Sequence, residues 1–216
     1  MPIPKHILDL ITATRVGLTN ARDTPDILAA LTPFGYDEIQ LGEGLDLVDT
    51  AEAEAERQDQ EYADQYNATN ELNEEIGALR AMYTRHVKLA RVAFQPGSKG
   101  YVTLGLRGQR ARTMPGLLSE ARSFYRAVEG SADLQAALTP LTVDAAAVTA
   151  GLAQADAVEA AQVAQQKETG EAQRATRTRD DAAAELRGFW KDFAQVAKIA
   201  LEDQPQLREV LGLLER

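Results

Sequence analysis

Apolar residues near the start of the chain recur every three or four positions. This is the spacing of one face of an α-helix and predicts a helix over residues 5–22. A short second helix should begin at Pro25, since proline fits the first helical turn. It should end before Thr32-Pro33, because proline cannot continue a helix and disfavours helical backbone in the residue before it. The apolar face of the first helix consists of Ile7, Leu10, Ile11, Thr14 and Leu18.

A long segment from Tyr36 to about Gln95 follows without a proline, and its apolar residues recur at a near-heptad spacing, as in a coiled coil. Because no Gly-Pro or Asn-Gly pair marks a turn, we favour one continuous helix over residues 36–95 to a helical hairpin broken near Tyr66–Asn70. The same alternatives apply to residues 143–201, where Gly170 is the helix breaker near the middle. The stripe consists of Val48, Ala55, Tyr62, Thr69, Ile76, Tyr83 and Ala90.

The whole pattern occurs twice. When the sequence is shifted by 107 positions, residues 7–109 align with residues 114–216 without a gap, and 25 of the 103 pairs are identical. An inserted residue would rotate a helix face by about 100°, so ungapped pairing indicates mostly rigid helix. Shared blocks at one offset indicate a tandem duplication. The matches include AALTP at 29–33 and 136–140, LGL at 104–106 and 211–213, Arg15 with Arg122, Asp37 with Asp144, and Gly44 with Gly151.

These patterns predict an all-α fold made by tandem duplication of a helical unit of about 107 residues. The two repeat units are residues 1–107 and 108–216, and we expect them to form one intertwined domain. The long helices should lie antiparallel, with a small helical bundle at each end.

The charges along the long helices agree with an antiparallel arrangement. Residues 49–75 hold ten acidic residues and one arginine, whereas the matching stretch of the second repeat contains several basic residues. A crossing near Tyr66 and Gln173 would bring Glu61 and Asp64 close to Arg177 and Arg174, although both runs are equally well explained as solvated helix faces.

Composition supports a helical protein, with 44% hydrophobic residues and 26% charged residues. The net charge of −10 should repel nucleic acid and anionic membranes, so neither is expected as a partner. The absence of cysteine excludes disulfides, thiolate zinc sites and cysteine nucleophiles. The N-terminus does not resemble a signal peptide, and no apolar run has the length of a membrane span, so a cytoplasmic location is expected.

Candidate chemistry is sparse. The two histidines, His6 and His86, do not follow a glutamate at the spacing of a di-iron bundle. Phe193 replaces His86 in the second repeat, which favours a surface or boundary histidine. Glycine-rich phosphate loops and a Ser-His-Asp set are also missing. We therefore predict no catalytic residue, no metal ligand and no cofactor.

Two charged segments need separate interpretations. Carboxylates could gather on one helix face for Ca²⁺ or Mg²⁺, but the second repeat has Val163 and Gln166 at two of their positions, and a solvated face is favoured. The basic segment Arg107–Thr113 joins the repeats and is interpreted as an exposed linker in preference to a nucleic-acid-binding arm, because the rest of the chain is acidic. The carboxylates are Glu52, Glu56, Asp59 and Asp64.

The layout resembles a loose group of bacterial proteins built from one or two all-helical units of about 100 residues. In that group a long Ala/Gln-rich helix precedes a segment that ends in Arg-x-x-Leu-Gly-Leu. The second repeat has this pattern at Arg208–Leu213, whereas the first has Tyr101 in place of the arginine. The resemblance implies an all-helical fold and no catalytic residues.

The sequence thus favours a non-enzymatic structural or interaction protein, an elongated helical module that contacts another protein or itself, or acts as a spacer. The alternative is a helical bundle that binds a small ligand or metal ion between its helices. An enzyme that uses only carboxylates, arginines and tyrosines is a third hypothesis. The aromatic residues that could line a ligand site are Tyr62, Tyr66, Tyr83 and Trp190.

Overall fold

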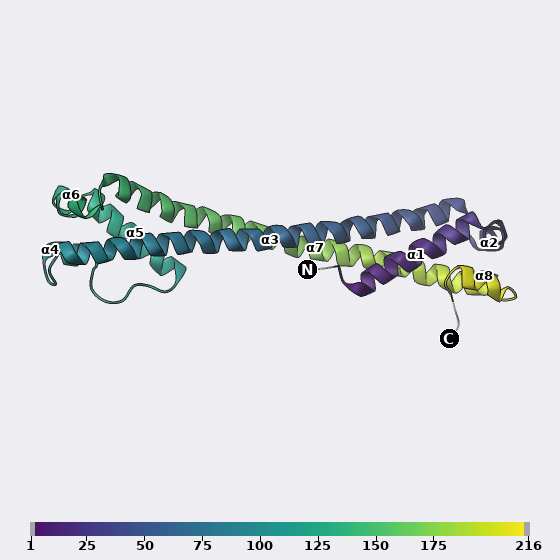
Figure 1. Cartoon of the computed structure of the whole chain (residues 1–216). Coiled ribbons are helices and arrows are strands. Elements are labelled where there is room, and N and C mark those ends of the chain that lie inside the picture. Colours follow the sequence, from purple (N-terminus) through teal and green to yellow (C-terminus); the bar gives the residue numbers. More distant parts are fainter. Residues whose placement is uncertain (1–2, 214–216) are drawn as a thin grey trace. The chain divides into compact units, whose positions relative to one another are not determined.

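The computed structural model describes residues 3–213, and all regular elements in this range are helical, which confirms the all-α prediction. The elements are shown in Figure 1. They are α1 (Lys5–Asp23), α2 (Pro25–Leu31), η1 (Thr32–Phe34), α3 (Glu38–Ala93), α4 (Lys99–Thr103), α5 (Met114–Glu129), α6 (Ala132–Leu138), η2 (Thr139–Leu141), α7 (Ala145–Ala200) and α8 (Pro205–Val210).

The two long segments are unbroken helices. Both α3 and α7 contain 56 residues, so the hairpin alternative is wrong for each. An aspartate caps each helix: Oδ1 of Asp37 accepts a hydrogen bond from Gln40 N at 2.9 Å, and Oδ1 of Asp144 accepts one from Ala147 N at 2.9 Å. These bonds satisfy amides that have no partner within the helix.

The chain divides into two compact units. Unit 1 comprises residues 1–64 and 169–216, and unit 2 comprises residues 65–168. Unit 1 holds α1, α2 and α8, unit 2 holds α4, α5 and α6, and each unit also contains part of α3 and part of α7. Each compact unit therefore takes residues from both predicted repeats.

Within unit 1, α3 and α7 run antiparallel. Tyr36, just before α3, contacts Phe193, whereas Gln58 further along α3 is hydrogen-bonded to Arg179, so the numbering rises on one side as it falls on the other. The core is built mainly from aliphatic side chains of α1, α2 and α3 packed on α7. Its largest members include Ile7, Leu18, Ile27, Leu31, Leu41 and Phe193.

The core of unit 2 contains more aromatic side chains. Tyr83 of α3 packs edge-to-face on Phe124 and Tyr125 of α5, with ring centroids 5.7 and 6.4 Å apart. His86 makes a similar contact with Tyr125 at 5.8 Å. Edge-to-face packing is the favoured arrangement of aromatic pairs, because the positive ring edge meets a negative ring face.

A glycine on each long helix lets a side chain pack directly on the helix backbone. A Cβ atom on Gly151 would lie against the ring of Tyr125, and one on Gly44 would lie against the ring of Phe189 and 2.8 Å from Leu18 Cδ1. These distances are too short for carbon atoms. Close packing therefore explains why both repeats have glycine here.

An arginine on the first helix of each repeat clamps two carboxylates of the long helix. Arg15 donates to Asp49 Oδ1 at 2.8 Å and to Glu52 Oε2 at 2.7 Å in unit 1. In unit 2, Arg122 donates to Oδ1 of Asp156 and Oε2 of Glu159, both at 2.7 Å. The Arg122 guanidinium also lowers the pKa of Glu159.

The heptad stripe is weakest in its middle, as the few strongly apolar residues there predict. Val48, Ala55, Tyr83 and Ala90 are buried, but Tyr62 is 43% exposed. A straight helix drifts by about 20° per heptad relative to a strict repeat, so one stripe cannot stay buried over this length.

The predicted ion pairs between the long helices of unit 1 do not form among residues 3–213. Glu61 instead pairs with Arg57 of its own helix at 3.9 Å, and Asp64 accepts a hydrogen bond from Gln60. Arg179 takes the position between the helices and donates to Gln58 Oε1 at 3.0 Å.

Within the described residues, no single helix has the length and apolar character needed to cross a membrane. One bent pair, Ala132–Leu141 with Ala145–Ala200 at 97°, passes the same test of length and composition.

Candidate functional site

The run of carboxylates on α3 does not form a metal site. Glu52 is held by Arg15, Asp64 accepts from Gln60, and Glu56 is exposed. Asp59 is half-buried on the same helix. These side chains have separate partners or face solvent, in keeping with the solvated-face interpretation.

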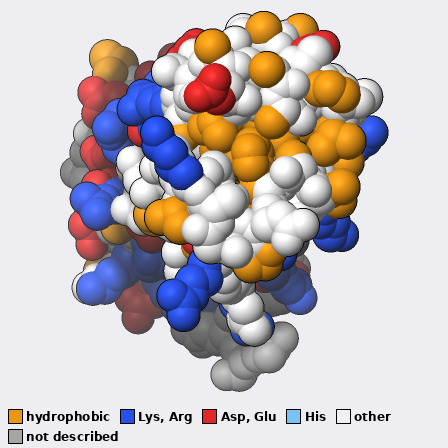
Figure 2. Space-filling view, turned by 90° about the vertical axis from the view of Figure 1, so that its left-hand side faces the viewer, with side chains coloured by type: hydrophobic (Ala, Val, Ile, Leu, Met, Phe, Trp, Pro, Cys, Tyr) orange, Lys and Arg blue, Asp and Glu red, His pale blue; other side chains and the backbone are white. Residues whose placement is uncertain are grey.

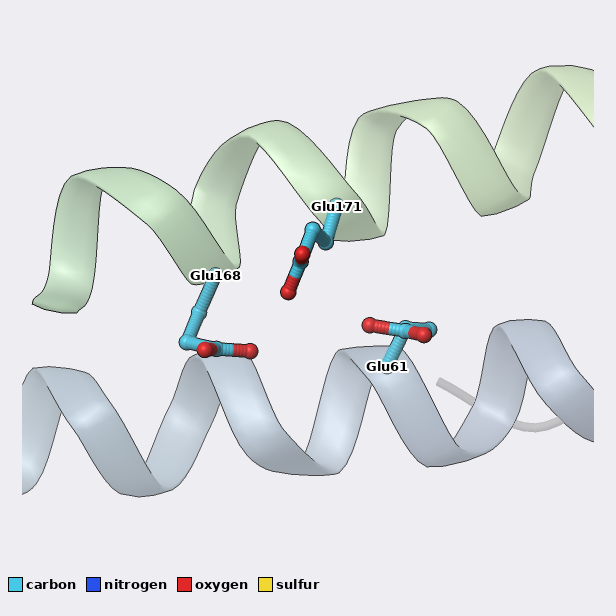
Figure 3. A group of neighbouring side chains, drawn as sticks. All are labelled: Glu61, Glu168 and Glu171. Carbon is cyan, nitrogen blue, oxygen red and sulfur yellow. The ribbon is translucent and has the colours of Figure 1, made fainter.

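Unit 1 holds a pair of carboxylates, Glu61 and Glu171, whose oxygen atoms lie within 4.8 Å of each other. Figure 3 shows Glu61 on α3 and Glu171 on α7 pointing toward each other. Two partly exposed carboxylates do not complete the coordination of a hard cation, so no metal site is assigned to this group.

The structure corrects the interpretation of His86, which is not a surface or boundary residue but is only 8% exposed. Its Nδ1 is 3.0 Å from the Tyr125 hydroxyl. Burial, together with the nearby Arg85 cation, lowers the pKa of His86, so the ring is neutral at pH 7. Burial also raises the pKa of Tyr125, which keeps its hydroxyl protonated. His6 is exposed on the first turn of α1.

The four aromatic residues proposed to line a ligand site do not come together. Tyr62 and Tyr66 are 43% and 63% exposed on α3. Trp190 is half-buried in unit 1, where it stacks on Phe193 with ring centroids 5.5 Å apart. Tyr83 alone, in unit 2, lines a cavity.

Unit 2 contains a segment in which every aspartate, glutamate, lysine or arginine position is basic. Residues 76–119 include eight arginines and lysines and no aspartate or glutamate, although the whole chain has 33 acidic and 23 basic residues. Unit 2 as a whole has 11 basic and 10 acidic residues, whereas unit 1 has 12 and 23. The net charge of the whole chain does not reveal this difference between the two units. Counting acidic and basic residues segment by segment does. The eight are Arg80, Arg85, Lys88, Arg91, Lys99, Arg107, Arg110 and Arg112.

Three of these arginines fasten the linker onto α3. Arg80 donates to the carbonyl oxygens of Ala111 and Arg112 at 3.2 and 3.0 Å. Arg91 donates to the Leu106 and Gly108 carbonyls at 2.8 and 2.9 Å. Linker carbonyls that would otherwise face solvent thus have charged donors, which form stronger hydrogen bonds than neutral ones. Arg110, the third, bonds the Tyr83 hydroxyl at 2.8 Å.

The remaining five cations have no hydrogen-bond or ion-pair partner among residues 3–213. They are exposed, and they come from α3, α4 and the linker. We refer to these five cations collectively as the basic face of unit 2: Arg85, Lys88, Lys99, Arg107 and Arg112.

Two adjoining hollows lie along α3 beside this face. The first, of about 600 Å³, is lined from Gly77 to Leu89 and includes Arg85 and Lys88. The second, of about 430 Å³, shares Ala81 and Arg85 with it and has His86 and Ala147 among its other lining residues. Both are mainly apolar with cations at the rim.

The end of unit 2 that holds α4 and α6 also carries exposed apolar side chains. Figure 2 looks onto this end and shows apolar side chains gathered there, with lysine and arginine around them. Val92 on the last turn of α3 and Val102 on α4 are 76% and 69% exposed. A surface that combines exposed apolar groups with unpaired cations is typical of an interaction site.

The chain matches no protein-family model, no curated protein and no solved structure.

Proposed function

We propose that the chain is a non-enzymatic interaction protein that binds an acidic protein surface through the basic face of unit 2. The observation that carries the proposal is the stretch of 44 residues, 76–119, without a carboxylate, which includes five exposed cations with no hydrogen-bond or ion-pair partner among residues 3–213. Cations that are not paired within the fold are available to an anionic partner and would steer its approach.

The absence of catalytic activity is part of this proposal. Among residues 3–213, neither histidine is hydrogen-bonded to a carboxylate, the partner that orients the base in a catalytic triad. His86, the buried one, is held by Tyr125 within an aromatic core.

We further propose that the chain arose by tandem duplication. Helices α2, α3, η1 and their counterparts α6, α7, η2 begin and end 107 residues apart. The aspartate caps, the glycine contacts and the arginine clamps also recur at this offset. On this proposal the two copies kept these caps, glycine contacts and arginine ion pairs while their surface charges diverged.

The partner that the surface fits best is an acidic helix with some apolar side chains. Such a helix can lie in an apolar hollow while its carboxylates meet cations at the rim. The chain itself offers this chemistry in residues 49–75 of α3, with ten acidic residues and one arginine. We therefore propose that the partner is a second copy of the chain, bound by its acidic part.

Sedimentation velocity at low and high salt tests this proposal. We expect association at low salt that weakens as salt screens the charges. The double variant Arg85→Glu with Lys88→Glu should abolish association. The matched control, Arg187→Glu with Lys191→Glu, changes two exposed cations of α7 in unit 1 and should leave association intact.

A chain that stays monomeric at every salt concentration contradicts the homotypic contact. Binding of duplex DNA or of anionic lipid vesicles by such a monomer, lost in the Arg85/Lys88 variant, would assign the basic face to a different class of partner.

A further inference from the structure

The linker closes a polar pocket in unit 2 that is separate from the hollows along α3. It has a volume of about 310 Å³ and lies between Tyr83 of α3, the linker and α5. Its size is at the lower end of the range for small-molecule sites, about 300–1,000 Å³. Its lining residues include Thr103, Arg107, Arg110, Ser119, Glu120 and Ser123.

Arg110 is fixed in the wall of this pocket. Its Nη1 donates to the Tyr83 hydroxyl at 2.8 Å, and its Nη2 donates to the carbonyls of Gly105 and Arg107 at 3.0 and 2.9 Å. Its Nε is buried and has no hydrogen-bond partner. A buried donor without an acceptor is destabilising, and an anion in the pocket would stabilise the charge of this guanidinium.

The charges around the pocket favour an anion. Arg107 and Arg110 provide two positive charges, and Glu120 provides the one negative charge among the lining residues. Glu120 is already engaged, since its oxygens accept from Ala111 N at 3.2 Å and lie 3.7 Å from Arg110. Arg107 is exposed and its side chain has no hydrogen-bond or ion-pair partner within residues 3–213, so one positive charge is left unbalanced there.

The α5 side of the pocket adds neutral donors. Ser119 and Ser123 lie one helical turn apart, on the same face of α5, and both line the pocket. Hydroxyl groups can donate to a phosphate or carboxylate oxygen. Leu104 and Phe124 provide the apolar part of the wall, which suits an organic ligand better than a bare inorganic ion.

The equivalent place in unit 1 is filled by protein. Trp190 stands where unit 2 has Tyr83, and Gly17 stands where unit 2 has Phe124. A Cβ on Gly17 would be 2.5 Å from Trp190 Cη2 and 3.1 Å from the Leu211 carbonyl oxygen. The residue that corresponds to Ser123 is Val16. The Ser123 hydroxyl of the unit 2 pocket is therefore not needed to build this corner of the fold.

From this geometry we infer that the pocket binds a small organic anion through one carboxylate or phosphate group, held by Arg107 and the two serine hydroxyls beside the Arg110 guanidinium. This ligand site goes beyond the proposed protein contact and does not depend on it.

Titrations of the full chain followed by ¹H–¹⁵N NMR test the inference. The probes are phenyl phosphate, benzoate and inorganic phosphate, added at constant ionic strength. The Arg110 Nε–H signal should shift and saturate with phenyl phosphate or benzoate. Which of these binds more tightly distinguishes a phosphate ligand from a carboxylate ligand.

Two variants and one control complete the test. Arg107→Ala and Ser123→Val remove ligand contacts without breaking a hydrogen bond of the fold, and each should weaken binding, the arginine variant by about tenfold. Arg112→Ala removes a cation of the same linker that does not line the pocket, and it should leave the affinity unchanged. The inference is overturned if Arg110 Nε–H does not shift, or if Arg112→Ala weakens binding as much as Arg107→Ala.

Discussion

Replacing Gly151 by alanine would place a Cβ atom inside the aromatic core of unit 2. This atom would lie 2.5 Å from Tyr125 Cε1 and closer to other carbons of the ring. Carbon atoms pack best at about 3.5–4.0 Å, so the ring or the helix would have to move by about 1 Å. Tyr125 is fully buried and its hydroxyl is bonded to His86, so the ring has no free space to enter.

The size of the effect follows from three contributions. Overpacking of a core by one carbon costs about 1–3 kcal/mol. Losing the Tyr125–His86 hydrogen bond as the ring moves costs about 1 kcal/mol. Alanine favours a helix over glycine by about 1 kcal/mol, which offsets part of the loss. We expect the free energy of unfolding to fall by about 2 kcal/mol.

Urea unfolding followed by far-UV circular dichroism measures this change. The matched control is Gly188→Ala, because Gly188 lies in the same helix and its added carbon would meet nothing within 4 Å. The control should gain about 1 kcal/mol from helix propensity. In a Tyr125→Leu background, Gly151→Ala should lose most of its cost. A Gly151→Ala variant as stable as Gly188→Ala would refute the packing argument.

Two further predictions concern pH and backbone conformation. The pKa of His86 is lowered from 6.5, so the unfolded chain takes up a proton that the folded chain does not. Stability in urea should therefore fall as the pH drops below about 6.5, by at most about 1.4 kcal/mol per pH unit, and His86→Phe should flatten this slope. Thr142 has φ 65° where the first repeat has Gly35. Thr142→Gly should raise the free energy of unfolding by about 0.5 kcal/mol, and an unchanged urea midpoint would contradict strain at this position.

The helices and their ends could be predicted because their signals are local. Pro25 and Pro33 mark a helix start and a stop, and α2 begins at Pro25 and ends at Leu31, just before Thr32-Pro33. Asp37 lies directly before α3 and caps it. Each signal acts within one helical turn of its residue, so it can be identified without knowledge of the tertiary fold.

Burial of single polar residues could not be predicted, because it depends on which distant residue lies opposite. The sequence favours a surface or boundary position for His86. In the structure His86 is buried, and its hydrogen-bond partner is Tyr125, which is 39 positions away. Arg179 is only 6% exposed, and its partner Gln58 is 121 positions away on another helix. The spacing of apolar residues along one helix contains no information about such pairs.

The candidate surface was missed for a different reason. The net charge of −10 was used to exclude anionic partners, yet it is the sum of a strongly acidic unit 1 and a unit 2 that contains 44 consecutive residues without a carboxylate. Association depends on the local electrostatic potential, and this potential decays over about 10 Å in salt. The net charge of the whole chain therefore says little about the potential at one face. The segment was visible in the sequence, but only a count by segment reveals it.

On the proposal that the chain arose by tandem duplication, the two copies keep their packing while their residues change. Unit 1 pairs the smallest residue, Gly17, with the largest, Trp190, where unit 2 pairs Phe124 with Tyr83. A larger side chain on one helix compensates a smaller one on the other, as close packing of a core requires. Neither position is identical between the repeats, so a comparison of single positions counts two mismatches. Considered as a pair, they are one packing solution in two forms, and the form in unit 2 lines a pocket.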